Sequence, residues 1–243
     1  MGEIISGKNA VLEAIKSGMT INKVMIAEHI DEHFAGAVLR LCRENHIPVR
    51  RLPRNKLNQL AGDDNRGVAA EAAAATYVEL SDIIEAAAAK GEPLLVVLLD
   101  GVEDPHNLGA IIRSAYCLGA HGLVISSRRS AQLNQTVMKT SSGAAAFLPV
   151  ARVANLNQAL ATLQEAGCWA VACDMDGQSL WHSDLTGPVA LVLGNEGAGI
   201  SPLLKKHCDF VVSIPMSANE VGSLNVSNAA AVMLCEVARQ RQG

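Results

Sequence analysis

Three short polar stretches in the second half of the chain carry the residue types that could do chemistry. They are Asn107-Leu-Gly-Ala-Ile-Ile-Arg113, Gly194-Asn-Glu-Gly-Ala-Gly199 and Ser223-Leu-Asn-Val-Ser-Asn228, and each follows an apolar run typical of a strand. Open α/β sheets bind ligands at the carboxyl ends of their strands. The stretches contain no Ser-His-Asp order, no metal-ligand spacing and no phosphate loop. Together they predict an enzyme that positions a nucleophile and forms no covalent bond with its substrate.

The first stretch offers an amide and a guanidinium on one expected helix. Asn107 stands where an N-cap belongs, and Arg113 lies about one and a half turns further on. A guanidinium can hold a phosphate or a carboxylate through two parallel hydrogen bonds. A capping asparagine and a surface arginine would explain the same residues without any function.

The other two stretches combine polar side chains with glycines or with a helix start. Glycines around Glu196 let the backbone wrap closely around a ligand. Glu196 could then accept a hydrogen bond or act as an acid or base, and a solvated turn residue is the alternative. We expect Ser223 to cap a helix over 223–240. Asn225 and Ser227 in its first turns have low helix propensity. Residues that disfavour the local structure without a gain in stability indicate a functional site.

From residue 93 onward, strand and helix patterns alternate, which is typical of a mostly parallel sheet. The expected strands are 94–99, 122–126, 147–150, 168–173, 189–193 and 210–214, and the expected helices are 107–118, 132–140, 155–166, 201–207 and 223–240. The uninterrupted apolar runs at 94–99 and 189–193 predict strands that are covered on both faces.

A small α/β unit is expected over residues 1–78. Its helices are predicted at 9–15, 31–45 and 56–61 and its strands at 21–27, 47–52 and 67–76. The alanine-rich run 67–76 favours a helix by propensity, but Gly67 and Thr76 at its ends favour the strand that we predict. Residues 79–92 contain a short capped helix and Gly91, and we expect them to link this unit to a second domain, 93–243.

The composition fits a folded enzyme of the cytoplasm. Hydrophobic residues make up 49% of the chain and charged residues 18%, which argues against disorder. No apolar run is long enough to span a bilayer and no signal peptide is evident, so we expect no membrane partner. The six cysteines form no Cys-x-x-Cys pair and fit buried thiols of a reducing compartment. His29 and His33 have no third ligand nearby, so we expect no metal.

The charge is distributed unevenly along the chain. A net charge of −4 gives no overall basic field, which nucleic-acid binders usually show. Residues 1–78, however, carry ten Lys and Arg against nine Asp and Glu, whereas the rest carries ten against fifteen. A local basic cluster in the first unit is the best candidate for phosphate contacts, with a solvated surface as the alternative. Its members are Arg50, Arg51, Arg54, Lys56 and Arg66.

In this order, the three stretches resemble the signature motifs of the SpoU/TrmH branch of the SPOUT methyltransferases. These are RNA ribose 2′-O-methyltransferases that use S-adenosylmethionine, and the resemblance covers roughly residues 93–241. The opening Ser6-Gly-Lys-Asn-Ala-Val-Leu-Glu-Ala resembles the ribosomal-protein-like RNA-binding domain of 23S ribosomal RNA guanosine 2′-O-methyltransferases.

The resemblance implies a fold, an assembly and a substrate. The fold is α/β: a small N-terminal α/β domain is followed in the chain by a domain with a C-terminal trefoil knot near residues 190–230. The assembly is a homodimer with the active site near its interface. The substrate is a guanosine of 23S ribosomal RNA. The alternatives are a methyltransferase that acts on the ribose of a transfer RNA and a non-catalytic RNA-binding assembly factor of the same fold.

The resemblance also implies roles for individual residues. The catalytic set is Asn107, Arg113, Glu196, Ser223 and Asn225. The set that binds S-adenosylmethionine is Leu193, Gly194, Asn195, Gly197, Ile214, Met216, Ser223, Leu224 and Ser227. RNA would contact the basic cluster, S-adenosylhomocysteine would be the product, and no metal would take part. Arg113 matches the family's proposed base, but a guanidinium stays protonated in proteins, so we interpret it as a phosphate anchor that polarises the hydroxyl.

Overall fold

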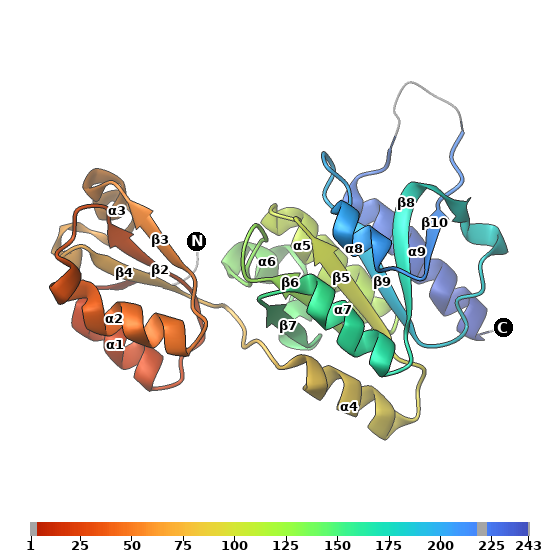
Figure 1. The fold of residues 1–243 in the computed structure, drawn as a ribbon, viewed down its shortest axis with the longest axis horizontal. Helices are drawn as coiled ribbons and strands as arrows, with labels where there is room; N and C mark the ends of the chain where they lie inside the picture. The colour runs from red at the N-terminus through yellow and green to blue at the C-terminus, as the bar shows by residue number, and fades with distance from the viewer. Residues whose placement is uncertain (1–3, 218–222, 243) are drawn as a thin grey trace. The chain divides into compact units, whose positions relative to one another are not determined.

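The computed structural model describes residues 4–217 and 223–242, which form two compact units (Figure 1). Residues 4–76 together with 132–135 make the first unit, and the other residues make the second. Residues 79–92, expected as a linker, contain α4 (Leu80–Lys90), whose Ile83 and Ala87 are buried in the core of the second unit. The segment is thus part of the second unit, and the division falls between Thr76 and Tyr77.

The first unit is a four-stranded sheet with helices on both faces. The sheet order is β1 (Ile4–Ser6), β4 (Val68–Ala72), β2 (Ile21–Ala27), β3 (Val49–Leu52), and the helices are α1 (Lys8–Lys16), α2 (Glu32–Glu44) and α3 (Arg54–Ala61). Along β2, Val24 and Ile26 pack with α1 and α2, whereas Met25 packs with α3. β4 confirms the strand predicted for the alanine-rich run. β1 was not predicted, because three residues are too few to show a period.

Parallel strands alternate with helices in the second unit, as predicted. In the part that the structure describes, the sheet order is β10 (Phe210–Ser213), β8 (Trp169–Ser179), β9 (Val189–Gly194), β5 (Leu95–Asp100), β6 (Gly122–Ser126), β7 (Val150–Val153). One face is covered by α4, α7 (Leu156–Glu165) and α8 (Pro202–Lys206), and the other by α5 (Pro105–Cys117), α6 (Gln135–Thr140) and α9 (Val226–Gln242) (Figure 1). Neighbouring strands all run parallel. The central strands β5 and β9 are buried on both faces, which explains their uninterrupted apolar sequences.

The chain changes direction across this sheet at β5. From β5 it adds β6 and β7 on one side, and it then returns to place β8, β9 and β10 on the other. β5 and β9 are neighbours, with Asp100 paired with Gly194 at their carboxyl ends. The loops after these two strands therefore leave the sheet side by side, at the kind of switch point where α/β proteins bind ligands.

Capping residues account for the differences between the predicted and observed helix starts. α5 begins at Pro105 because Asp104 accepts a hydrogen bond from the N–H of His106 at 2.9 Å, so the prediction of Asn107 as N-cap was wrong. α9 begins at Val226, later than predicted. The side chain of Asn225, rather than that of Ser223, accepts from the backbone of the first turn. Ser223 and Leu224 consequently lie in the loop before the helix.

β8 runs on to Ser179, whereas the apolar pattern predicted a strand that ends at residue 173. Its pairing with β10 is irregular: Val211 pairs with Ala172, but Val212 pairs with Gln178. Residues 173–177 therefore leave the regular register as an excursion of the strand. Gly177 permits this path, because a Cβ there would lie 2.5 Å from the backbone carbon of Val211.

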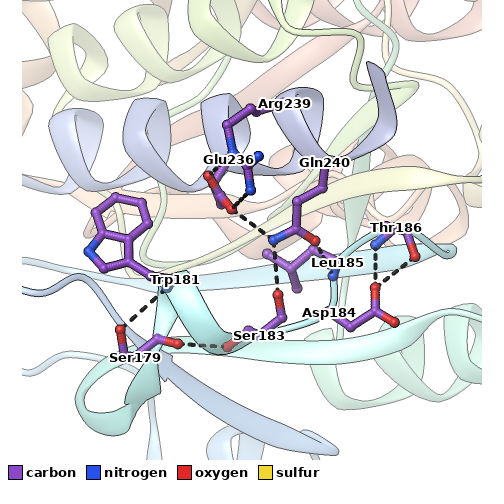
Figure 2. Close-up of polar contacts among 9 residues, drawn as sticks. All are labelled: Ser179, Trp181, Ser183, Asp184, Leu185, Thr186, Glu236, Arg239 and Gln240. Atoms are coloured by element: carbon purple, nitrogen blue, oxygen red, sulfur yellow. Dashed lines mark hydrogen bonds and ion pairs between the residues drawn. The ribbon is translucent and has the colours of Figure 1, made fainter. Parts of the chain in front are cut away.

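The carboxyl end of α9 is anchored to the segment that follows β8 (Figure 2). Gln240 donates a hydrogen bond to the carbonyl of Ser183 at 2.9 Å and accepts one from the N–H of Leu185 at 2.7 Å. Glu236, only 5% exposed, accepts hydrogen bonds from Arg239 and Gln240. These contacts fix one end of the helix whose other end carries Asn225.

Two expectations about the second unit concern features beyond its sheet. The trefoil knot implied near residues 190–230 involves residues 218–222, which lie outside the described residues, and it stays a prediction. Across 4–217 and 223–242, no helix combines the length and the apolar character that crossing a membrane would need.

Candidate active site

Side chains from all three polar stretches meet at the carboxyl edge of the second sheet. Asn107, in the first turn of α5, donates a hydrogen bond to Oε1 of Glu196 at 3.1 Å. Asn225 donates to Oδ1 of Asn107 at 3.1 Å and also to Oε1 of Glu196. The fold therefore joins one residue of each stretch, although Asn107 and Asn225 are 118 positions apart in the sequence.

The glycine-rich loop after β9 closes tightly on itself and presents Glu196. A Cβ on Gly194 would lie 2.0 Å from the backbone carbon of Gly199, so a side chain at residue 194 would force the loop open. Oδ1 of Asn195 accepts a hydrogen bond from the N–H of Gly197 at 2.9 Å, which stabilises the turn from within. Glu196 lies in this turn and is exposed.

A cavity of about 310 Å³ opens beside this network. It is bounded by the loop after β9, by the segment after β10 and by the excursion of β8. The implied donor-binding residues that line it are Leu193, Gly194, Asn195, Gly197, Ile214, Met216, Ser223 and Leu224. Ser227 is not among the lining residues, and its hydroxyl donates instead to Asn225 at 2.6 Å. We call this cavity the donor cavity, because the resemblance implies that residues of its lining bind the methyl donor.

A second cavity shares part of its wall with the donor cavity. Both are lined by Asn195, Glu196, Gly197 and Val226, whereas the loop after β5, including Asn107, lines only the second. Glu196 thus borders both spaces. Two ligands bound in neighbouring cavities would meet at this carboxylate.

Arg113 lies outside the network and lines neither cavity. It follows Asn107 on α5 by about 9 Å of helix rise and about 240° of rotation, so it faces a different side of the helix. Its side chain is exposed and makes no hydrogen bond or ion pair within residues 4–217 and 223–242. Within the described part of one chain, no hydrogen bond or ion pair joins Arg113 to Glu196.

The basic cluster lies on the first unit, along an edge strand and the segments after it. Arg50 and Arg51 are on β3, Arg54 and Lys56 are on α3, and Arg66 lies just before β4. All five side chains are exposed. Arg51 also approaches Glu32 at 3.5 Å, a contact that solvent weakens. The placement suits contacts with phosphates.

Cys173, Asp174 and Met175 are among the residues that line the donor cavity but were not in the predicted set. They belong to the excursion of β8, directly after its apolar run. Their position at the carboxyl end of a predicted strand was the available signal. Burial raises the pKa of the Cys173 thiol to about 11, so this thiol is neutral at pH 7.

Two family models match the chain, one over each unit. The SpoU rRNA Methylase family matches residues 94–235. The chain belongs to this family. A second model, described as RNA 2′-O ribose methyltransferase substrate binding, matches residues 4–78, which include the basic cluster. SpoU methyltransferases use S-adenosylmethionine, and the chain is an RNA methyltransferase of this kind.

Known proteins resemble the chain over nearly its whole length. YacO of Bacillus subtilis, which its name places in the TrmH family of tRNA/rRNA methyltransferases, is 42% identical over 98% of this chain and 96% of its own. The SpoU methyltransferase AviRb of Streptomyces viridochromogenes, crystallised with AdoMet (S-adenosylmethionine), has a TM-score of 0.63 and 28% identity over 98% of this chain and 90% of its own. An AdoMet-bound rRNA methyltransferase from Sinorhizobium meliloti has a TM-score of 0.60 and 25% identity, with coverage of 97% and 86%. The similarity therefore extends over both units.

The donor cavity offers suitable surfaces for such a methyl donor. Leu193, Ile214, Met216 and Leu224 supply apolar surface for a flat heterocycle. Carboxylates at the same wall favour a cation. The part of the chain that the structure describes contains no group of three or more His, Cys, Asp or Glu side chains that could hold a metal ion.

Proposed function

We propose that the chain methylates a ribose 2′-hydroxyl in RNA, and that the target is a guanosine of 23S ribosomal RNA. The observation that carries the proposal is the network of Asn107, Glu196 and Asn225, which borders two adjoining cavities. The description of the model that matches the first unit, RNA 2′-O ribose methyltransferase substrate binding, supports the ribose hydroxyl. The resemblance of this unit to the N-terminal domain of the 23S-specific enzymes supports the ribosomal target.

The proposed reaction needs alignment more than it needs a strong base. When bound in the donor cavity, S-adenosylmethionine supplies a methyl group that is already activated by the positive charge on its sulfur. Fixing the attacking oxygen in line with that methyl group can supply roughly 7–11 kcal/mol of the barrier. The residues of this chain therefore act mainly by holding the two reactants in place.

Glu196 is placed to orient the attacking hydroxyl. The amides of Asn107 and Asn225 both donate to its Oε1, which fixes the carboxylate. No hydrogen bond within the described residues engages its Oε2. We assign Oε2 to the ribose hydroxyl, which would occupy the second cavity and donate to this oxygen. Ser223, at the wall of the donor cavity, would contact the donor.

The exposed position of Arg113 supports a homodimer in which each site uses an arginine from the other copy. Tyr116 lies on the same helix and is 47% exposed, and Phe147 beside it is 70% exposed, with ring centroids 5.9 Å apart. Exposed apolar groups of this kind mark surfaces for protein contacts. In such a dimer, Arg113 would hold the phosphate next to the ribose bound by the other copy and polarise the hydroxyl.

Transfer of a tritiated methyl group into RNA tests the proposed function. Total RNA from a bacterial strain that lacks the modification is incubated with the protein and labelled S-adenosylmethionine, and the labelled ribose is mapped. We expect label at one guanosine of 23S ribosomal RNA. Label in transfer RNA would favour the alternative substrate. Binding of S-adenosylmethionine without any transfer would contradict an enzymatic role and favour an assembly factor.

Variants of the basic cluster test its proposed contacts with RNA phosphates. Replacing Arg50 and Arg51 together by alanine should weaken RNA binding. It should also reduce the slope of log affinity against log salt concentration by the amount expected for the loss of about two phosphate contacts. A matched pair of changes on α2, Arg40→Ala with Arg43→Ala, should leave the salt dependence as it is, because these arginines lie outside the cluster. Equal effects of the two double variants would contradict a specific role for the cluster.

Mixed dimers test whether Arg113 acts in the other copy's site. Arg113→Ala and Glu196→Gln subunits should each be inactive alone. Mixed and re-equilibrated in equal amounts, they should recover about a quarter of the wild-type rate, since half of the dimers would contain one intact site. No recovery, with exchange of subunits confirmed by mass spectrometry, would show that both residues act within one chain.

A further inference from the structure

The excursion of β8 brings an acidic side chain to the wall of the donor cavity. Asp174 lines the cavity together with Cys173 and Met175. Its neighbour in the excursion, Asp176, does not line the cavity and is more exposed: the side chain of Asp174 is 28% exposed and that of Asp176 is 69% exposed. Two aspartates two residues apart thus have different surroundings.

One lysine fixes both aspartates. Nζ of Lys205 on α8 donates to Oδ2 of Asp174 at 2.8 Å and to the two oxygens of Asp176 at 2.7 and 2.9 Å. Oδ1 of Asp174 accepts from the N–H of Met175 at 2.7 Å, so both of its oxygens are held. The two carboxylates carry one more charge than the lysine neutralises, and the group keeps a net charge of −1.

The charged side chains among the described residues of the cavity wall are all acidic. Glu196 adds a second carboxylate to the lining, and none of the described lining residues is Lys, Arg or His. Asp174 is half-buried and therefore less screened by water and salt than Asp176. The wall consequently attracts a cation from the side of Asp174.

We infer that Asp174, held by Lys205, is a specificity residue that makes the donor cavity prefer the cationic methyl donor to its neutral product. The inference rests on the proposed placement of S-adenosylmethionine in this cavity. When the ribose oxygen bonds to the methyl carbon, the bond between that carbon and sulfur breaks, and the hydroxyl proton passes to the carboxylate of Glu196 or to water. The sulfur keeps the electron pair and becomes a neutral thioether, so the attraction to Asp174 falls. Product would then be released readily and replaced by fresh donor.

Titration calorimetry with S-adenosylmethionine and S-adenosylhomocysteine, on the full-length protein without RNA, tests this inference. Asp174→Asn should weaken donor binding about tenfold and leave product binding within about twofold, because only the donor carries the sulfonium charge. Asp176→Asn removes the same charge from the same lysine but lies off the cavity wall, so it should change the ratio of the two affinities less than threefold. Asp174→Glu should retain most of the preference.

Removing a positive charge instead of a negative one gives an independent check. This check also serves if the Asp174→Asn variant does not fold. Lys205→Gln removes the neutralising cation and should increase the preference for the donor, and raising the salt concentration should reduce that preference. The inference would be overturned if Lys205→Gln left the ratio unchanged, or if Asp174→Asn and Asp176→Asn shifted it equally. Failure of the wild-type protein to bind either compound would instead contradict the proposed donor cavity itself.

Discussion

The two ends of helix α9 carry similar side chains in opposite settings. At its start, Asn225 donates to the carboxylate of Glu196, and both residues are exposed. At its other end, Gln240 donates to the carboxylate of Glu236 at 2.8 Å, and Glu236 is 5% exposed (Figure 2). One pair joins segments that are far apart in the sequence, and the other lies within a single helical turn.

This difference separates a pair suited to chemistry from one that holds the fold. Both oxygens of Glu236 accept hydrogen bonds from Arg239, and Gln240 also binds the backbone of Ser183 and Leu185. A buried group with such partners has no capacity left for a ligand, and its loss would leave unsatisfied partners. Glu196 borders two cavities, so a change there should affect ligands more than folding.

Breaking the exposed pair should have the largest effect. Glu196→Ala should lower the methyl-transfer rate about 100-fold, as loss of a preorganised polar contact to the reacting group typically does. Its free energy of unfolding in urea should change by less than about 0.5 kcal/mol, because the side chain is exposed. Glu165→Ala, an exposed helical glutamate away from both cavities, is the control and should change neither quantity. Parallel losses of rate and stability would make Glu196 a structural turn residue.

A change at the anchored carboxyl end of α9 should have the opposite result and lower stability more than ligand binding. Arg241 donates to the carbonyls of Pro93, Leu94 and Gly187 at 2.8, 3.2 and 2.7 Å. Arg241→Ala should cost about 2 kcal/mol of unfolding free energy, because these acceptors lose a charged donor, while donor affinity measured well below the melting temperature stays within threefold. Gln242→Ala, in the same terminal turn, should be neutral in both measurements. A large loss of donor affinity in Arg241→Ala at unchanged stability would contradict the division between the two ends.

The smallest expected effect is a pH dependence of the stability that Glu236 contributes at the carboxyl end of α9. Hydrogen bonds from Arg239 lower the pKa of Glu236 to about 2. Its folded-state pKa lies below its unfolded-state pKa, so its stabilising contribution is complete near neutral pH and is lost as the pH falls from about 5 towards 2. Glu236→Gln should therefore be less stable than wild type at pH 7, by about 1 kcal/mol or less since Arg239 is exposed. Urea unfolding at pH 7, 4 and 3 should show this gap closing, and a constant gap would contradict the account.

Local patterns were sufficient for much of the second unit. The uninterrupted apolar run of β5 indicated a strand covered on both faces. In α9, Val226, Ala230, Met233 and Val237 stand three or four positions apart, which is the spacing of one helix face, and all four are buried. Both signals depend on residues a few positions apart, which share a face whatever the rest of the chain does. Gly194 and Gly199 were equally informative, because the close backbone approach at residue 194 and the positive φ of 67° at residue 199 both favour glycine.

Helix starts and strand ends were less predictable, because they depend on which side chain captures a free backbone group. Asp104 caps α5 in place of Asn107, and Asn225 caps α9 in place of Ser223. In both cases several residues that can cap stand close together, and propensity alone does not choose among them. The excursion of β8 depends on the register of β10, a strand more than thirty residues further along the chain.

The sequence by itself determined the residue types of the site, the family that they resemble, and the alternation of strands and helices that carries them. Only the tertiary structure decided that Asn107, Glu196 and Asn225 touch, that Asp174 joins the cavity wall, and that Arg113 does not. The physical reason is range. Periodicity and propensity act over a turn or a strand, whereas these contacts arise from the order of strands in the sheet and from the rotation of each helix against it.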